Sequence, residues 1–348
     1  MMGKGNTRRR LIFVFALIAV FLIAPAVLPL YRVSLLTEVI IFSLYAISYN
    51  FLLGYAGLLS FGHALFFGTG GYLAALLVNH IPGISLWGVV FVSAIITAAI
   101  GLLIGGLLLR QKGAYFALLT LAFNYLFYAI ATKWYSVTGG DDGLSLSRPS
   151  LDFGVFTISL SSPVAFYYFT FITLGLLIAY CWYFTHTAMG QTIVLIRENE
   201  ERMKFVGYNP HVTRLILFVF TGTLAGVAGT FYALHFEFVS VNAVSIDMTT
   251  AVLLMTFIGG MSTFWGPILG AAVYIHLQDF LSDLTDRWPL IMGLIFVLMV
   301  LYMPQGLSGL CFFLKDRVRG MVFCKNIKPF GFRNVSAQIG CKQNERIS

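Results

Sequence analysis

Repeated apolar runs close to 20 residues long limit the fold of this chain more than any other feature of its sequence. A helix of ~20 apolar residues spans the ~30 Å hydrocarbon core of a bilayer. Only 10% of the residues are charged, 59% are hydrophobic and the mean hydropathy is +0.86, whereas about a quarter of the residues in a soluble domain are charged. The sequence lacks the alternating segments of about ten residues that build a membrane β-barrel. We therefore predict an all-α polytopic membrane protein.

Ten membrane spans follow from the apolar runs and the polar residues between them. They are predicted at residues 11–30, 35–53, 56–78, 87–109, 114–132, 165–185, 212–236, 248–264, 267–282 and 289–309. The first begins after Arg8-Arg9-Arg10, as a signal peptide does, but its apolar run continues to Leu30, which favours an uncleaved helix. An even number of spans places both termini on the same side of the membrane.

Positive charge predicts the orientation of these spans. With both termini in the cytoplasm, all but four of the 22 lysines and arginines lie on the cytoplasmic side, in agreement with the positive-inside rule. The exceptions are Arg32, Lys133, Arg148 and Arg287. The main loops are then external at 133–164 and cytoplasmic at 186–214, and residues 311–348 form a basic cytoplasmic tail. The net charge of +8 thus reflects membrane orientation and does not indicate nucleic-acid binding.

Glycine interrupts two apolar stretches, residues 54–72 and 258–271. Each glycine costs a helix about 1 kcal/mol relative to alanine, and a membrane tolerates a broken or re-entrant helix where the freed backbone groups find partners. Paired interruptions in the two halves of a chain indicate a transport pathway between inverted repeats. The alternative is close helix packing, which we favour for the pairs Gly101/Gly105 and Gly222/Gly226.

Residues 197–210 form a dense run of charge between apolar segments. Asn199 is suited to cap the N-terminus of a helix of about two turns, and Gly207 is suited to end that helix in the left-handed conformation. Oppositely charged pairs four residues apart support the helix. They are Glu198/Arg202 and Glu200/Lys204.

The same run carries apolar residues that a helix this short cannot bury alone. They are Met203, Phe205 and Val206. After them, Asn209-Pro210 restarts a helix with proline in its first position. The run is therefore either a solvated linker or a helix that inserts into a groove of a cytoplasmic partner.

The longest predicted external loop contains the turn-rich segment Thr138-Gly139-Gly140-Asp141-Asp142-Gly143-Leu144. Residues 155–160 are compatible with a short hairpin strand. Aspartates beside glycines are commonly solvated turn residues. The functional alternative is that Asp141 and Asp142 dock a partner outside the membrane.

Several kinds of chemistry are disfavoured by the sequence. It contains no GxxxxGK[ST] P-loop, so ATP and Mg²⁺ would be bound by another subunit. The four cysteines have no CxxC spacing, and we predict no metal or cofactor on this chain. Gly306-Leu307-Ser308-Gly309 has the form of a membrane serine-protease nucleophile, but it follows Pro304 without a candidate base, which favours a helix-ending turn. Acidic residues lie near the ends of the spans, which argues against proton- or sodium-coupled transport.

Polar or adaptable side chains within the spans are candidates for a translocation pathway. They are Tyr55, Ser60, His63, Asn124 and Met255. Ionisable groups inside a membrane are functional by default, and His63 lies in the first interrupted stretch. The alternative for the polar residues is a hydrogen bond to a neighbouring helix.

Four segments of the chain, in this order, resemble the LivM-type permease family of bacterial branched-chain amino acid ABC transporters. They are Leu53–Ala64 (LGYAGLLSFGHA), Thr138–Leu144 (TGGDDGL), Ile196–Tyr208 (IRENEERMKFVGY) and Ile258–Ala271 (IGGMSTFWGPILGA). The resemblance runs from about residue 35 to Gly309, and the related urea-transporter permeases share much of it. The chain departs from the family at Arg202-Met203 and Phe205, where small residues are usual, and in its longer tail.

The resemblance implies a permease domain at residues 1–310 that forms half of a pathway for branched-chain or related hydrophobic amino acids in the bacterial inner membrane. It implies a LivH-type partner permease, two cytoplasmic ATPases and a periplasmic binding protein, and no catalytic site on this chain. ATPase coupling is then expected from Arg197, Glu198, Glu200, Glu201, Arg202 and Gly207. The alternatives are a permease for urea or short-chain amides and a stand-alone channel or facilitator for a small neutral solute.

Overall fold

A computed structural model describes residues 24–152, 157–302 and 306–309. Most of the first predicted span, both termini and the predicted tail at 311–348 lie outside the described residues. The described chain is predominantly helical, which confirms the predicted all-α class.

The longer helices coincide with the predicted spans from residue 35 onward, with shifted boundaries. They are α2 (Leu30–Asn50), α3 (His63–His80), α4 (Leu86–Leu108), α5 (Ala114–Lys133), α7 (Pro163–His186), α10 (Pro210–Phe236), α11 (Ile246–Gly259), α12 (Gly266–Leu284) and α13 (Trp288–Tyr302). Five segments of the described chain are long and apolar enough to cross a membrane: Leu30–Tyr55, α4, α5, α7 and α10. The other predicted spans are shorter or less apolar, so the count of ten stays a prediction.

Short elements occupy the two ends of the helices. They are the π-helix η1 (Phe51–Tyr55), α6 (Tyr135–Thr138), the 3₁₀ helices η2 (Gly140–Asp142) and η3 (Val241–Val244), α8 (Ala188–Glu198), α9 (Glu200–Phe205) and the strands β1 (Leu144–Ser145), β2 (Leu151–Asp152), β3 (Thr157–Ile158) and β4 (Phe238–Val239). Strand β2 pairs with β3, as the hairpin prediction for the external loop anticipated. Strand β1 pairs antiparallel with β4, which the sequence did not suggest.

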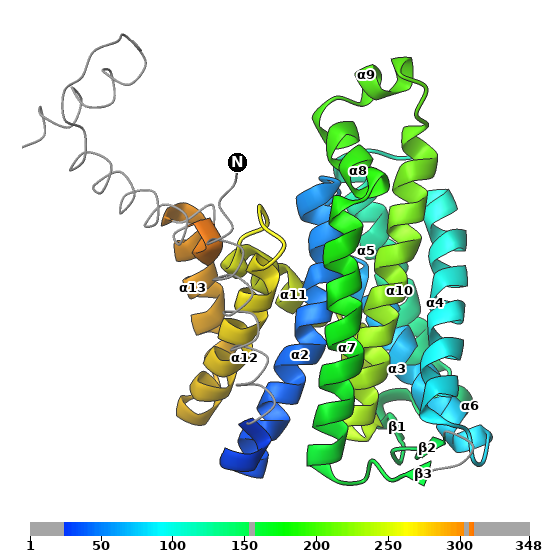
Figure 1. Ribbon diagram of the computed structural model, residues 1–348, viewed down its shortest axis with the longest axis vertical. Coiled ribbons are helices and arrows are strands. Elements are labelled where there is room, and N and C mark those ends of the chain that lie inside the picture. The colour runs from blue at the N-terminus through cyan, green and yellow to red at the C-terminus, as the bar shows by residue number, and fades with distance from the viewer. Residues whose placement is uncertain (1–23, 153–156, 303–305, 310–348) are drawn as a thin grey trace, which may run out of the picture. The chain divides into compact units, whose positions relative to one another are not determined.

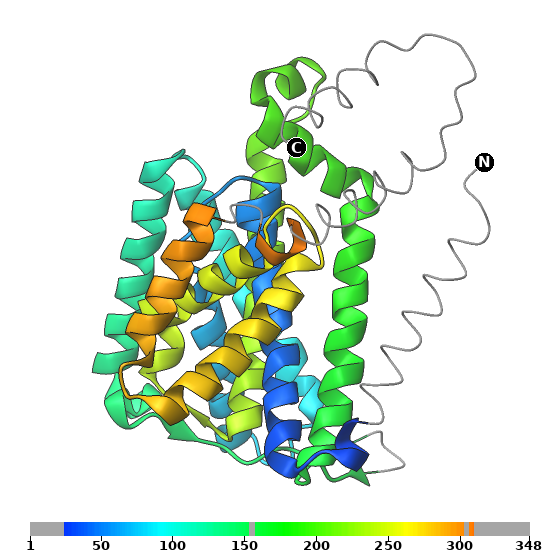
Figure 2. The same cartoon turned by 90° about the vertical axis from the view of Figure 1, so that its left-hand side faces the viewer.

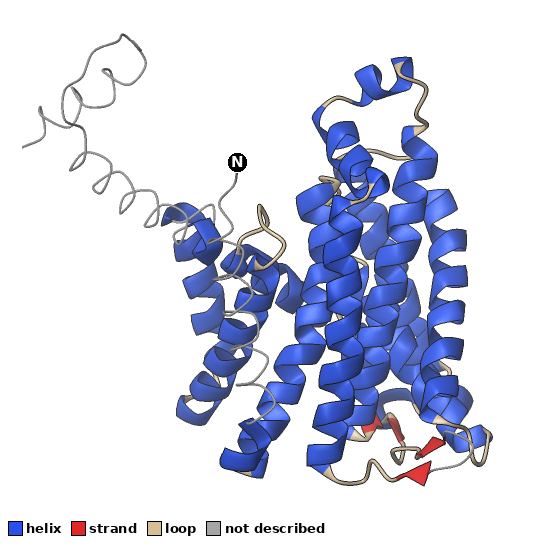
Figure 3. Ribbon diagram, in the orientation of Figure 1, coloured by secondary structure: helices blue, strands red, loops and turns tan. Residues whose placement is uncertain are grey.

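The short helices α8 and α9 and the strands lie at opposite ends of the long helices. Helices α8 and α9 project at one end, and the strands gather at the other (Figure 1; Figure 3). Lys112 and Arg214 lie beside α9 at the first end, whereas Arg148 lies beside the C-terminus of α10 at the second. We call the α8–α9 end the cytoplasmic end, following the positive-inside prediction.

Helix α10 lies at the centre of the packing. It contacts α2, α3 and α4, while α7 and α12 pack against α2. Helices α11, α12 and α13 pack together, and they lie toward the viewer in Figure 2. Without a hydrophobic driving force between helices in lipid, small residues that let backbones approach provide the close contacts.

Glycines make the contact between α3 and α10 unusually close. A Cβ on Gly70 would collide with the carbonyl oxygen of Gly226, and one on Gly229 would collide with that of Phe67. The hydroxyl of Thr230 donates a hydrogen bond to the carbonyl of Gly70 across this contact (3.1 Å). The glycines of α3 therefore pack without interrupting the helix, which corrects the predicted extent of the broken segment, 54–72.

The predicted packing pairs are confirmed in the same region. A Cβ on Gly222 would press on the ring of Phe66, and one on Gly226 would collide with Thr97 of α4. Gly105 is similarly crowded by Phe218 and Leu215 of α10. Helix α10 thus approaches α3 and α4 through the small residues that the sequence spacing had marked.

We predict that Gly70→Ala will destabilise the protein strongly. The added methyl group must push α3 away from the α10 backbone, and overpacking of this kind costs about 1–3 kcal/mol. Thermal unfolding of the detergent-purified chain measures the effect. The control is Gly106→Ala in α4, where a Cβ meets nothing within 4 Å; equal unfolding temperatures for the two variants would contradict the prediction.

Candidate functional site

The chain is unwound between η1 and α3, at residues 56–62. We call these residues the unwound segment. Tyr49 donates from its hydroxyl to the carbonyl of Ser60 (3.0 Å), and the amide of Phe61 donates to the hydroxyl of Thr120 (3.0 Å). The amide of Leu58 donates to the carbonyl of Leu52 (2.8 Å). These partners replace the hydrogen bonds of a helix, as non-helical backbone in a membrane requires. The predicted interruption is confirmed here.

The unwound segment returns into the helix bundle. Its partner Thr120 lies six residues into α5, which is ~9 Å along the helix at 1.5 Å per residue. A Cβ on Gly62 would collide with the carbonyl of Thr120, so the backbones touch. Two residues after Gly62, the amide of Ala64 donates to the hydroxyl of Thr249 in α11 (3.1 Å). Helix α3 therefore begins inside the protein, between α5 and α11.

His63 begins α3 and is fully buried. Its Nε2 lies 2.8 Å from the hydroxyl of Ser48, and its ring stacks on Tyr45 with a centroid distance of 5.4 Å. Tyr49 meets the ring edge-on and also holds the backbone of Ser60. The Nδ1 atom of His63 has no hydrogen-bond partner among the described residues. His63 and Ser60 are thus brought together by one tyrosine of α2.

A second irregular connection, residues 237–245, lies between the predicted spans 212–236 and 248–264, but its path into the helix bundle was not predicted. It carries β4 and η3 and leads from α10 into α11. Asn124, in the middle of α5, donates to the carbonyl of Val244 (2.9 Å), and a Cβ on Gly68 of α3 would collide with the Val244 side chain. Helix α11 therefore also begins inside the bundle, next to Asn124. The polar residues Ser240 and Asn242 were the sequence signal for this connection.

The second predicted interruption, 258–271, is the connection between α11 and α12 at residues 260–265. A Cβ on Gly259 would collide with the carbonyl of Gly266, and a Cβ on Gly270 would collide with the carbonyl of Met255. These glycines therefore allow α11 and α12 to cross in close contact. Met255 is fully buried at this crossing, and its place in the pathway stays a prediction.

The ends of α9 agree with the sequence prediction. The side chain of Asn199 accepts a hydrogen bond from the amide of Arg202 (2.9 Å), and Gly207 has a φ of 98°. The amides of Gly207 and Tyr208 donate to the carbonyls of Lys204 and Met203, a pairing that closes many helix C-termini. Short local interactions thus define a rigid turn of helix at the cytoplasmic end.

Glu200 connects α9 to two other parts of the protein. Its carboxylate lies 2.7 Å from Lys112 in the α4–α5 connection, 2.9 Å from Arg214 in α10 and 3.0 Å from Lys204 in α9. Hydrogen bonds from Lys112, and then from Lys204 and Arg214, lower the pKa of Glu200 to about 2. The predicted pair with Lys204 is confirmed, and the other two partners show that Glu200 faces inward.

Arg197 connects the cytoplasmic loop to the unwound segment. Its guanidinium donates to the carbonyl of Gly54, the residue that precedes Tyr55 at the end of η1. Its side chain also covers Gly57, where a Cβ would lie 3.2 Å from the Cγ of Arg197 and where φ is +69°. Arg197, a predicted coupling residue, therefore meets the first interrupted stretch at Gly54, 143 positions earlier in the sequence.

Other predicted coupling residues face away from the protein. Glu198, Glu201 and Arg202 are exposed. Phe205 is 92% exposed and Val206 is 66% exposed, whereas Met203 is buried, so the predicted apolar edge is divided between the two sides of α9. We call Phe205 and Val206 the outer apolar pair. These two side chains are therefore accessible to another protein.

Asp141 and Asp142 lie at the opposite end, in η2, and both are exposed. The hydroxyl of Tyr135 donates to Asp142 (3.1 Å), and this hydrogen bond raises the pKa of Tyr135. Gly139 and Gly143 flank the turn with positive φ. The segment is a fixed turn, and its docking role stays a prediction.

Arg148 is a structural residue that the sequence did not single out. It donates to the carbonyls of Leu234 (2.9 Å) and His235 (2.7 Å) at the end of α10, and it pairs with Glu237 (3.2 Å). Its guanidinium also lies 4.6 Å from the ring centroid of Phe166. Arg148 therefore fixes the external loop to the point where the 237–245 connection leaves α10.

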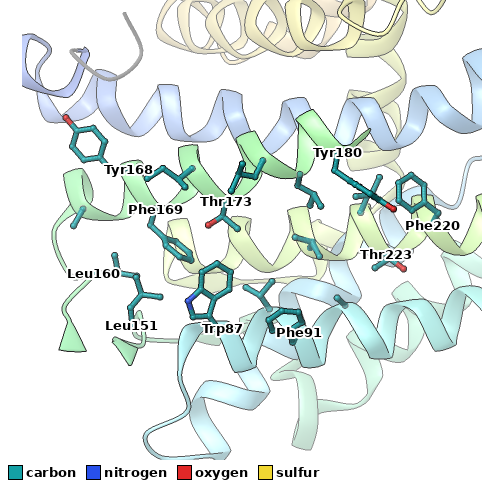
Figure 4. Close-up of a pocket in the computed structure, with 18 residues that line it drawn as sticks. Trp87, Phe91, Leu151, Leu160, Tyr168, Phe169, Thr173, Tyr180, Phe220 and Thr223 are labelled. Atoms are coloured by element: carbon teal, nitrogen blue, oxygen red, sulfur yellow. The ribbon is translucent and has the colours of Figure 1, made fainter. Parts of the chain in front are cut away.

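An apolar cavity lies apart from these residues. It has a volume of about 900 Å³, is floored by α10 between α4 and α7, and is lined almost entirely by apolar side chains such as Trp87, Phe91 and Phe169 (Figure 4). None of the five predicted pathway residues contributes to its lining. Because Phe91, Ile172 and Leu176 on its walls are mostly exposed, the cavity is an apolar groove open at the protein surface.

Ser308, the candidate nucleophile, is buried at 6% exposure and has no hydrogen-bond partner in the part of the chain that the structure describes. A Cβ on Gly306, two residues earlier, would collide with the backbone of Gly260. The residues around Ser308 therefore pack against the α11–α12 connection, which agrees with the predicted turn.

A family model described as "Branched-chain amino acid transport system / permease component" matches residues 31–303. This chain belongs to that permease family. The match covers the unwound segment, the 237–245 connection and α8–α9. The permease is 28% identical over 323 residues to the high-affinity branched-chain amino acid transport system permease protein LivM of Salmonella typhimurium, covering 87% of this chain and 76% of the relative.

Two further relatives show the range of the family. A probable branched-chain amino acid transport permease protein LivM of Methanocaldococcus jannaschii is 24% identical over 312 residues, covering 75% of this chain and 88% of the relative. The autoinducer 2 import system permease protein LsrC of Klebsiella pneumoniae is 30% identical over 186 residues, covering 52% of this chain and 50% of the relative. No solved structure matches the permease significantly.

We predict that Thr120→Val will destabilise the permease. Valine keeps the shape of threonine but leaves the amide of Phe61 without its acceptor, and an unsatisfied buried group costs about 1–3 kcal/mol. The control is Thr132→Val on the same helix, because the Thr132 hydroxyl donates only to Tyr128 one turn earlier. Thermal unfolding in detergent should rank Thr120→Val well below Thr132→Val; the reverse order would contradict the role of Thr120.

Acid should loosen the cytoplasmic loop through Glu200. Its pKa is lowered from 4.5 to about 2, so the ionised carboxylate stabilises the loop above pH 4.5 and this stabilisation is lost as the pH falls toward 2. Glu200→Gln should show, already at pH 7, the lowered protection against amide hydrogen exchange at 199–208, relative to the intrinsic rate at each pH, that the native protein shows only in acid. Exposed Glu201→Gln is the control, and equal exchange in both variants would argue against the Glu200 contacts.

Proposed function

We propose that this chain is the membrane subunit of an ABC importer and forms half of a pathway for branched-chain or related hydrophobic amino acids in the bacterial inner membrane. A second permease would form the other half, two cytoplasmic ATPases would drive the cycle, and an external binding protein would deliver the solute. Family membership and the names of its relatives support a permease role. The absence of a P-loop from the sequence is consistent with ATP hydrolysis on separate subunits.

The contact of Arg197 with Gly54 and Gly57 carries this proposal. It joins the helix pair α8–α9, which projects at the cytoplasmic end, to the backbone that leads directly into Ser60 and His63 (Figure 1). A movement of α8 therefore has a direct mechanical route to the unwound segment. Coupling between distant sites requires such an element that both sites contact.

The outer apolar pair supplies the surface on which an ATPase would act. Phe205 and Val206 extend from α9, and Glu200 binds the inner side of the same helix to α10 and to the α4–α5 connection. A force applied to the outer side of α9 would therefore reach both α10 and Arg197. Large aromatic side chains contribute most of the binding energy at many interfaces.

The proposed pathway passes the two helix ends that lie inside the bundle. Helices α3 and α11 begin there and meet through the hydrogen bond from Ala64 to Thr249. The N-terminal end of a helix carries partial positive charge, which suits the carboxylate of an amino acid in transit. Ser60, His63 and Asn124 lie near these ends, while the surrounding side chains are apolar and suit an aliphatic solute.

A second candidate function is a stand-alone channel or facilitator, or a permease for urea, short-chain amides or another small solute. The partial similarity to a permease that is named for autoinducer 2 import supports keeping other solutes open. Reconstitution of this chain alone in liposomes separates the candidates. Leucine flux without ATPases would contradict the importer proposal, whereas uptake that requires the partner permease, ATPases, binding protein and ATP supports it.

We predict that Phe205→Ala will reduce ATP-driven leucine uptake by the reconstituted complex about tenfold or more, the loss expected when a central aromatic contact is removed. Gly207→Ala should act in the same direction, because alanine is strained at a φ of 98°. The matched control is Phe238→Ala, which removes a partly exposed phenylalanine at the opposite end. Unchanged uptake in both loop variants would contradict a coupling role for α9.

A further inference from the structure

A second cavity, of about 320 Å³, lies at the cytoplasmic end beneath α8 and α9. One wall is the beginning of the unwound segment, Ala56–Leu58, and the opposite wall is the connection from α4 to α5, Leu109–Gly113. Arg197 and Arg214 reach into it from α8 and α10. We call this space the basic cavity.

The basic cavity has more positive than negative charge on its walls. Lys112, Arg197 and Arg214 line it, and Glu200 is the carboxylate that binds two of them. Both oxygens of Glu200 are already engaged, one of them also by Lys204 outside the cavity. The charge of Arg197 is therefore left without an acidic partner among the described residues.

Hydrogen-bond donors also remain unused in this space. The Nε of Arg214 is buried and has no partner within the described chain. Arg197 uses one nitrogen for the carbonyl of Gly54 and has further donors on its planar guanidinium. An anion with several oxygens would satisfy such a group, because arginine binds carboxylate and phosphate through two parallel hydrogen bonds.

The N-terminus of α5 opens on the same cavity. Gly113 lines the cavity and precedes a helix of 20 residues, yet it offers no side chain to cap it, and the first turn of α5 contains no acidic residue. The free amides and the dipole of such a helix end favour a bound anion. Three basic side chains and an uncapped helix end thus converge on one space of suitable size.

We propose that the basic cavity binds the phosphate group of an anionic phospholipid from the cytoplasmic leaflet. Exposed apolar side chains close in sequence to the wall residues Leu109 and Gly113 favour a lipid over free phosphate: Leu107 at the end of α4 is 58% exposed, and Tyr115 and Leu118 at the start of α5 are 71% and 61% exposed. Acyl chains can lie along these residues while the headgroup contacts Lys112 and Arg197. Anionic lipids concentrate in the cytoplasmic leaflet and attract basic segments there.

A bound lipid would connect the parts of the protein that meet at this end. Its phosphate would contact the start of α5, Arg197 of α8 and Arg214 of α10, next to the backbone of the unwound segment. The inference concerns binding by this chain and does not depend on which solute is transported or on whether the chain works with ATPases.

Native mass spectrometry of the full-length chain in detergent tests the proposal, with phosphatidylglycerol and phosphatidylcholine of equal chain length offered in competition. The decisive variants are Lys112→Gln and Lys204→Gln. Both lysines pair with Glu200 and both are largely exposed, but only Lys112 lines the cavity. Arg197→Gln, compared with Arg202→Gln, provides a second matched pair.

The native chain and Lys204→Gln should retain phosphatidylglycerol in preference to phosphatidylcholine. Lys112→Gln should lower that preference about fivefold, the change expected for losing one basic contact at a membrane surface. Equal losses in Lys112→Gln and Lys204→Gln, or no lipid preference in the native chain, would overturn the proposal. Inorganic phosphate that raises the unfolding temperature as much as phosphatidylglycerol does would overturn the assignment to a lipid.

Discussion

The need to satisfy backbone hydrogen bonds inside the bilayer governs this structure. Residues 56–62 leave the helical conformation within an apolar bundle, and several of the freed backbone groups have a specific partner: Tyr49, Thr120, Ser60 or Leu52. Tyr49 lies on α2 and Thr120 on α5, so the unwound segment also connects these two helices. An irregular backbone at this depth occurs only where protein or a water-filled cavity surrounds it.

At the cytoplasmic end, charged side chains hold the helices together, whereas backbone hydrogen bonds do so in the interior. Glu200 holds α9 to α10 and to the α4–α5 connection, and Arg197 holds α8 to the end of η1. The same helix pair exposes Phe205 and Val206 on its other side. The helix pair α8–α9 is therefore bound to the unwound segment on one face and open to a partner on the other. This geometry can transmit movement, because a force on the outer face changes the contacts on the inner face.

The helices and the ends of α9 were predictable because local patterns determine them. Apolar run length gives the spans, and Asn199 and Gly207 bound α9 through contacts that extend only a few residues. Partners distant in sequence were not predictable. The second irregular connection depends on Asn124 meeting Val244, and the inward orientation of Glu200 depends on Lys112 and Arg214. Gly70 and Gly71 contributed to a predicted break, yet they allow α3 to contact α10, and this could be seen only once the partner helix was known.

The central claim is that Arg197 transmits movement from the cytoplasmic loop to the unwound segment. The most direct measurement is the rate at which a membrane-impermeant thiol reagent labels Leu59→Cys in the assembled transporter, with the native cysteines replaced, with and without a nonhydrolysable ATP analogue. Leu59 lies in the unwound segment and is 36% exposed. We predict that the nucleotide changes the labelling rate when Arg197 is present and has no effect after Arg197→Ala. An equal nucleotide-dependent change in both proteins would contradict the account.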